Sequence, residues 1–146
     1  MKKMLCVALI FLVIPSSINA ASTPQELIST AINSLPPHQN WDRVAIFQSV
    51  GPMSFEILIY YKEDPEGDEE VEAETKTVAE VILQRLVAEG RDLKKDSVTV
   101  YVHGFRQTTR PSGKPSLIDY GFAYYNYADD LLVYRPGPYN PLRSHR

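Results

Sequence analysis

Three histidines, His38, His103 and His145, are the side chains in this sequence that are best suited to acid–base chemistry at neutral pH. His38 follows a double proline, and His145 is the second-last residue. Only His103 falls in a segment with a strand pattern, where it shares one side with Tyr101 and Phe105. Any catalytic role would therefore depend on His103.

A hydrolytic site built on His103 would also need a nucleophile and an orienting group. Asp119 or a serine could supply these groups. Ser112 and Ser116, however, lie in a plain Pro/Gly stretch and not on a sharp strand-to-helix turn. We therefore expect His103 to be a structural strand residue, no residue to be catalytic, and the protein not to be an enzyme.

Residues 111–115 read Pro-Ser-Gly-Lys-Pro, which superficially resembles a phosphate-binding loop. The first glycine of that motif is missing, and proline stands after Lys114 where serine or threonine is required. No helix is expected to follow and donate its N-terminus to a phosphate. The sequence therefore predicts no nucleotide site, and no other cofactor motif is present.

An acidic run extends from Glu63 to Glu74 and raises the question of a cation site. The oxygen ligands that calcium prefers are supplied by a set around one glycine: Asp64, Glu66, Gly67, Asp68 and Glu70. Their spacing does not match a twelve-residue calcium loop, and Pro65 stiffens its entry. We expect a solvated loop and helix start with no metal site, and leave cation binding by this run open.

The last strands of the chain are rich in tyrosine, which is common on surfaces that bind partners. Simple alternation places Tyr120, Phe122 and Tyr124 on one side and Tyr125 and Tyr127 on the other. We expect the second pair to face water. The sequence therefore predicts a partner-binding surface that includes Tyr125, Tyr127 and the later Tyr134.

Basic residues accompany these tyrosines. Arg106 ends a strand, and Arg110 and Lys114 lie in a predicted loop over residues 107–116. Surface charge is usually only solvated, but a basic end opposite the acidic run could also recognise an anionic partner. We therefore add Arg106, Arg110 and Lys114 to the predicted partner-binding residues.

The first 20 residues have the layout of a secretory signal. A cationic start with Lys2 and Lys3 precedes an uncharged apolar run from residue 4 to 14, and small residues end at Ala20. A membrane-spanning helix needs about 20 apolar residues. The only cysteine, Cys6, lies in the apolar run, so cleavage after Ala20 would leave a domain without disulfides or thiolate sites. We expect export from a bacterial cell, most simply to the periplasm, with secretion to the medium as the alternative.

The charge distribution limits the partners. The whole chain has a formal net charge of −3, with acids in excess before residue 90 and bases in excess after it. A strongly basic balance, which nucleic-acid binding normally requires, is absent. We therefore expect a protein partner in the cell envelope, no nucleic acid and no membrane span after signal cleavage.

The predicted elements form one small domain. Thr23, Pro24 and Glu26 are typical of a helix start, so one helix is expected over 24–35 and a longer one from the acidic run to residue 89. Strands are expected over 41–50, 54–61, 97–106, 117–127 and 131–135. Residues 136–146 contain three prolines and are predicted to be a basic, disordered tail.

The order αββαβββ predicts an α+β fold with two layers. A mostly antiparallel five-stranded sheet would carry both helices on one face, and the crossover through the long helix would allow one parallel contact. We expect a non-enzymatic protein-binding module, for example an inhibitor or immunity-type protein. The alternatives are a structural accessory that docks through its tail and, less favoured, a small hydrolase.

Overall fold

A computed structural model describes residues 22–138 of the chain. The predicted export signal, Cys6 and residues 139–146 of the predicted tail lie outside this range. Two helices and five strands follow one another as α1 (Pro24–Asn33), β1 (Trp41–Gln48), β2 (Ser54–Tyr61), α2 (Asp68–Ala88), β3 (Thr99–Thr109), β4 (Pro115–Asn126) and β5 (Leu131–Pro136). The predicted αββαβββ order is confirmed.

The five strands form one sheet in the order β1-β2-β3-β4-β5. The pairs β1–β2, β3–β4 and β4–β5 are antiparallel, and β2 and β3 run parallel. A parallel pair needs a long crossover, and α2 supplies it between β2 and β3. The two-layer α+β prediction is therefore confirmed, and the parallel contact that the crossover allowed is the β2–β3 pair.

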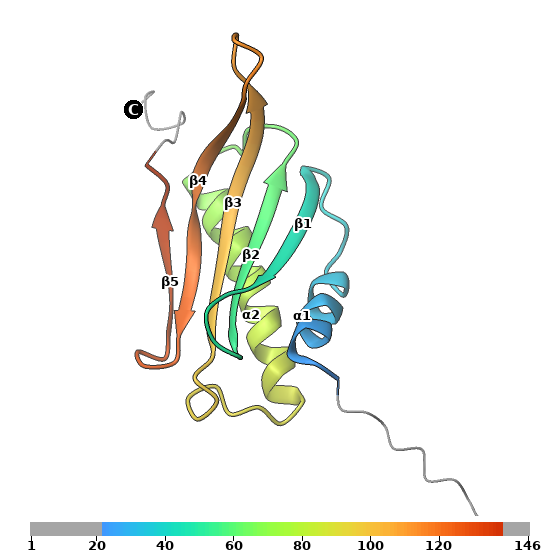
Figure 1. Cartoon of the computed structure of the whole chain (residues 1–146), viewed down its shortest axis with the longest axis vertical. Coiled ribbons are helices and arrows are strands. Elements are labelled where there is room, and N and C mark those ends of the chain that lie inside the picture. The colour runs from blue at the N-terminus through green and yellow to red at the C-terminus, as the bar shows by residue number, and fades with distance from the viewer. Residues whose placement is uncertain (1–21, 139–146) are drawn as a thin grey trace, which may run out of the picture.

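Both helices lie on one face of the sheet, with α2 behind β2, β3 and β4 and α1 beside α2 (Figure 1). Helix α1 begins with a capping box, in which the side chains of Thr23 and Glu26 each accept a hydrogen bond from the backbone amide of the other residue. The side of α2 that meets the sheet is apolar and fully buried at Val71, Val78, Ala79, Ile82 and Leu86. The core therefore lies between this helix face and alternate residues of the strands.

A bulge in β4 changes which side chains point into that core. Gly104 pairs with Gly121, but the next residue, Phe105, pairs with Asp119, so Tyr120 is an extra residue in β4. Tyr120 is fully buried. Gly121 has a φ of +130°, a conformation that side chains rarely adopt. The simple alternation expected for this strand is therefore broken at Gly121.

The hairpin between β3 and β4 is longer than predicted. Pairing continues to Thr109 and Pro115, and only residues 110–114 form the turn. The predicted loop over 107–116 is therefore wrong, because the strands extend beyond the rest of the sheet as a two-stranded arm (Figure 1).

The predicted start of the tail at Pro136 is also too early. Pro136 pairs with Gly121 as the last residue of β5. Gly137 is buried and donates its amide to the carbonyl of Tyr120 at 3.0 Å. The ordered chain therefore continues past residue 135, because the backbone of Tyr120 and Gly121 at the β4 bulge pairs with residues 136 and 137.

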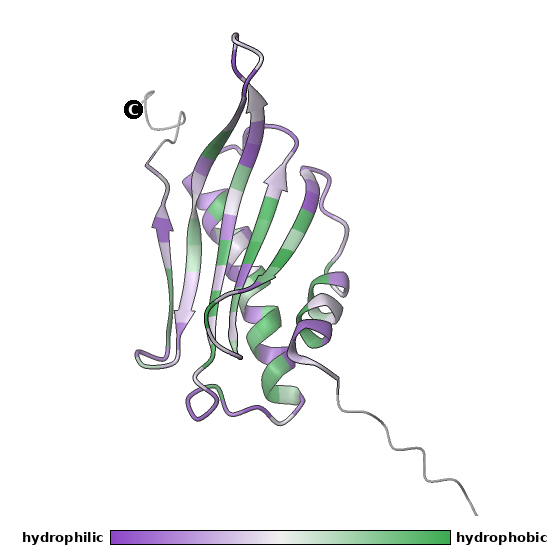
Figure 2. Ribbon diagram, viewed as in Figure 1, coloured by the Kyte–Doolittle hydropathy of each residue, from purple (hydrophilic) through white to green (hydrophobic). Residues whose placement is uncertain are grey.

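Apolar residues follow the strands and the second half of α2, whereas the loops at both ends of the sheet are hydrophilic (Figure 2). Within residues 22–138, neither helix has the length and hydrophobicity required to cross a membrane. The unusual feature is the side of the sheet that faces away from α2, because it is also partly apolar and neither helix covers it.

Candidate functional site

The side of the sheet away from α2 carries a group of rings that we call the aromatic strip. It comes from the three central strands, β2, β3 and β4. Its members are the half-buried residues Tyr60, Tyr101, His103, Phe105, Phe122 and Tyr124. A sheet covered on one face normally presents polar side chains to water on the other, so a strip of six rings that no element of residues 22–138 covers requires an explanation.

The rings of the strip contact one another without a gap. His103 is at the centre, with ring centroids 5.6 Å from Phe105 and 5.0 Å from Phe122. Tyr101 continues the strip to Tyr124 at 5.7 Å. The rings around His103 are nearly parallel, with interplanar angles of 5° to Phe105 and 29° to Phe122. Their faces therefore lie against each other.

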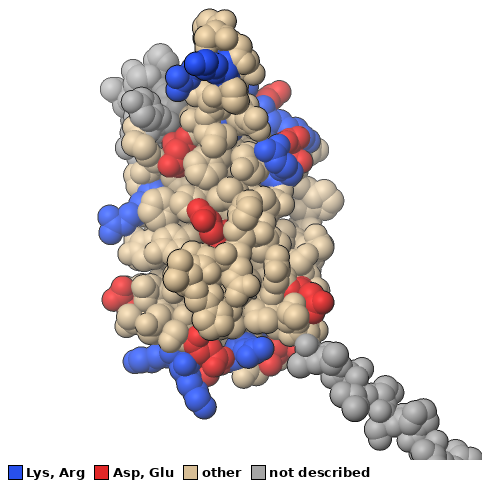
Figure 3. Space-filling view, in the orientation of Figure 1, with Lys and Arg blue, Asp and Glu red and all other residues tan. Residues whose placement is uncertain are grey.

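An arginine from each edge strand lies at an end of the strip. The guanidinium carbon of Arg43, on β1, is 3.9 Å from the ring centroid of Tyr60. That of Arg135, on β5, is 5.9 Å from the centroid of Tyr124. Figure 3 looks onto this side of the molecule and shows mainly uncharged side chains across its middle. The site is thus an apolar strip with an arginine at each end, and Arg43 also pairs with Asp42 at 2.8 Å.

The tyrosine hydroxyls of the strip are available for further bonds. Among residues 22–138, no hydrogen bond engages the hydroxyl of Tyr60, Tyr101 or Tyr124. These three groups remain accessible to water or to a bound molecule. The strip therefore combines apolar rings with unused donors and acceptors.

His103 is held neutral by its surroundings. Burial among the rings lowers its pKa, and the nearby carboxylates of Glu56 and Asp119 only partly oppose this effect. Its Nε2 atom lies 3.5 Å from Glu56, while its Nδ1 atom is buried and has no partner within the described chain. Nothing in this geometry presents His103 to a nucleophile.

The predicted water-facing position of Tyr125 is wrong. Because of the bulge at Gly121, Tyr125 points into the core, where it is 4% exposed and its hydroxyl donates to Asp130. This environment raises the pKa of Tyr125 to about 12. Tyr127 and Tyr134 are half-buried against the same core, and Tyr134 donates to the carbonyl of Tyr120. On β4, the rings that face away from α2 are instead Phe122 and Tyr124, and both are half-buried.

The predicted basic residues lie at the opposite end of the sheet. Arg110 and Lys114 are exposed at the β3–β4 turn, about ten residues or roughly 30 Å along β4 from Tyr125. Arg106 forms a 2.7 Å ion pair with Asp64. The structure therefore does not gather the six predicted residues into one surface, and partner binding by Arg110 and Lys114 stays a prediction.

Asp64 also bears on the calcium hypothesis. Its carboxylate accepts a hydrogen bond from the hydroxyl of Tyr120 and pairs with Arg106. These two contacts lower the pKa of Asp64, with the Tyr120 bond as the larger cause. The first oxygen ligand of the supposed calcium set is therefore already engaged in joining the β2–α2 loop to the sheet.

The chain matches no family model, no curated protein and no solved structure in comparisons with each.

Proposed function

We propose that this chain is a non-enzymatic module that binds a protein partner through the aromatic strip. The observation that carries this proposal is the unbroken contact of six rings on the face that neither helix covers. Burying such rings against a partner removes apolar surface from water. Tyrosine and arginine, which form the strip and its two ends, are also the residue types most often found at binding hot spots.

A protein surface suits the strip better than a nucleic-acid base. Stacking on a base requires an open ring face, and the faces around His103 are covered by neighbouring rings. The chain's net charge of −3 also disfavours a polyanionic ligand. Arg43 already pairs with Asp42 at 2.8 Å. An apolar protein segment with a carboxylate near one end would therefore contact the ring edges and Arg135 together.

Export of this module to the periplasm, and an inhibitor or immunity-type role there, belong to the same proposal. They are supported by the signal-like sequence of residues 1–20 and by the absence of any cofactor motif in the sequence. Docking by the tail is less favoured, because Pro136 belongs to β5 and Gly137 bonds to Tyr120.

A crosslinked pull-down from the bacterial envelope tests the proposal. The full precursor carries a C-terminal tag, and we expect one protein to co-purify in stoichiometric amounts. The double variant Tyr101→Ala/Phe122→Ala should bind that protein at least about 100-fold more weakly, because both rings lie at the centre of the strip.

The matched control is Val87→Ala, which removes an apolar side chain that is 53% exposed on α2. It should bind as the wild type does. Equal binding by the strip variant and the wild type, or no partner at all for a folded wild-type protein, would overturn the proposal. Loss of binding on deletion of residues 139–146, with the strip variant unaffected, would favour the structural-accessory alternative.

A further inference from the structure

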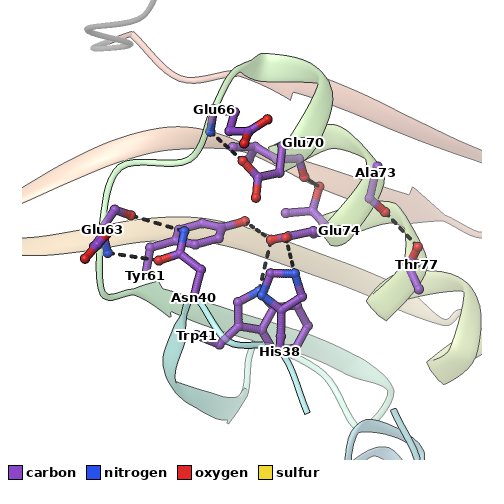
Figure 4. Close-up of polar contacts among 12 residues, drawn as sticks. His38, Asn40, Trp41, Tyr61, Glu63, Glu66, Glu70, Ala73, Glu74 and Thr77 are labelled. Carbon is purple, nitrogen blue, oxygen red and sulfur yellow. Dashed lines mark hydrogen bonds and ion pairs between the residues drawn. The ribbon is translucent and has the colours of Figure 1, made fainter. Parts of the chain in front are cut away.

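A polar cluster lies around Glu74, on the helix side of the sheet and away from the aromatic strip. The side chain of Glu74 is 11% exposed. Its Oε2 atom accepts hydrogen bonds from the hydroxyl of Tyr61 at 2.7 Å and from the indole N–H of Trp41 at 2.9 Å (Figure 4). Two donors on one oxygen fix the carboxylate and leave Oε1 directed at His38.

His38 and Glu70 complete this cluster from two directions. His38 comes from the α1–β1 loop, stacks on Trp41 at 4.9 Å and places Nε2 2.6 Å from Oε1 of Glu74. Glu70 lies one turn before Glu74 on the same face of α2 (Figure 4). One ligand atom from each of the three residues lies within 4.8 Å of the other two.

The charge of this cluster is not balanced by a permanent cation. Within residues 22–138, no lysine or arginine forms an ion pair with Glu70 or Glu74. The only basic side chain that pairs with either carboxylate is His38, which contacts Glu74. Two carboxylates this close repel each other unless a cation lies between them. A divalent ion would neutralise both.

We propose that His38, Glu70 and Glu74 bind a divalent transition-metal ion, for which Zn²⁺ is best suited. One imidazole nitrogen and two carboxylate oxygens form a ligand set that zinc accepts. This inference does not depend on the proposed partner-binding function.

The geometry needs only small adjustments to hold the ion. Tetrahedral zinc places its nitrogen and oxygen ligands about 3.3 Å apart, so His38, whose Nε2 atom lies 2.6 Å from Oε1 of Glu74, must retreat slightly. His38 can move, because its side chain is 36% exposed on a loop. Oε2 of Glu70 accepts a hydrogen bond from the backbone amide of Glu66, which leaves Oε1 of that carboxylate for the ion. Glu74 stays fixed by Tyr61 and Trp41, as outer-shell partners fix the ligands of other metal sites.

The fourth coordination position can be filled by water. A pocket of about 260 Å³ borders His38 and Glu74 and is lined by Pro36, Pro37 and Ala73. The bound ion would tie the α1–β1 loop to α2. Metal binding to the folded state alone would therefore raise the thermal stability of the protein.

The test is zinc titration by calorimetry of the full chain after EDTA treatment and removal of the chelator, with a purification tag that contains no histidine. We expect saturable binding of one ion per chain, a higher melting temperature with Zn²⁺, and visible absorption typical of low-coordinate Co²⁺ when cobalt is used instead. His38→Gln and Glu70→Gln should each weaken binding at least about tenfold. Both sites are on the surface, so these variants should fold.

The matched control is Glu72→Gln, on the same helix, where the wild-type carboxylate pairs with Lys76. It should bind zinc as the wild type does, and so should Tyr101→Ala/Phe122→Ala, which separates this test from that of the proposed function. Unsaturable binding by the wild type, or equal zinc affinity in the wild type, His38→Gln and Glu70→Gln, would overturn the proposal.

Discussion

The hydroxyl of Tyr61, on β2, donates a 2.7 Å hydrogen bond to the carboxylate of Glu74, on α2. Tyr61 is 3% exposed, and its pKa is raised, first by burial and then by the bond to Glu74. The phenol therefore stays a donor at every physiological pH. This bond joins the sheet to its covering helix at the one carboxylate that Trp41 also contacts.

Tyr61→Phe should lower the free energy of unfolding by about 1–3 kcal/mol, because it leaves a largely buried carboxylate with one donor fewer. Urea titration followed by circular dichroism measures the change. The control is Tyr101→Phe, which removes a hydroxyl that makes no hydrogen bond within the described chain and should change stability by less than about 0.5 kcal/mol. Equal effects of the two substitutions would contradict the structural role of the Tyr61–Glu74 bond.

Gly121→Ala should destabilise the protein by at least about 2 kcal/mol more than Gly113→Ala. Both glycines have positive φ, so both substitutions strain the backbone. A Cβ atom at Gly121 would also lie 2.6 Å from the carbonyl oxygen of Arg135, whereas one at Gly113 would meet nothing within 4 Å. The difference between the two unfolding free energies isolates the clash at the bulge, and equal losses would refute it.

His103→Phe should raise the free energy of unfolding by about 1 kcal/mol at neutral pH, because it removes the unpartnered buried Nδ1 atom and keeps the ring contacts. The gain should grow as the pH falls below about 6.5. Since the pKa of His103 is lowered in the folded state, the unfolded wild type binds more protons there and the wild type loses stability.

His103→Gln separates the two effects. It cannot titrate, so it should lose the same pH dependence, but it keeps a polar group among the rings and should not gain stability at neutral pH. Urea titrations at pH 5 and pH 7.5 measure both quantities. If the difference in unfolding free energy between the wild type and His103→Phe is the same at both pH values, His103 does not titrate as described.

The elements of this fold could be predicted from local sequence because each has a local cause. The capping box at Thr23 and Glu26 fixes the start of α1, and β2 was predicted with the bounds Ser54–Tyr61 that the structure has. Alternation of apolar residues follows directly from the pleat of a strand. Short gaps between strands likewise indicated the antiparallel pairs.

The candidate binding surface could not be predicted, because the alternation of side chains between the two faces of β4 is interrupted at one residue. The extra Tyr120 shifts the register, so Tyr125 turns into the core and Phe122 and Tyr124 face away from α2. A sequence pattern that indicates the aromatic strip was present on β3, where every second residue from Tyr101 to Phe105 carries a ring. Gly121 between two aromatic residues was the only local mark of the bulge.

The sequence by itself determined the order of elements, the fold class and the polarity of each helix and strand, because these depend on neighbours a few residues away. Only the tertiary structure decided which rings form the aromatic strip and which polar groups meet. His38 and Glu74 are separated by 36 positions, and the packing of α1, β1 and α2 brings them to 2.6 Å. Such contacts depend on strand register and helix packing, which local sequence patterns do not specify.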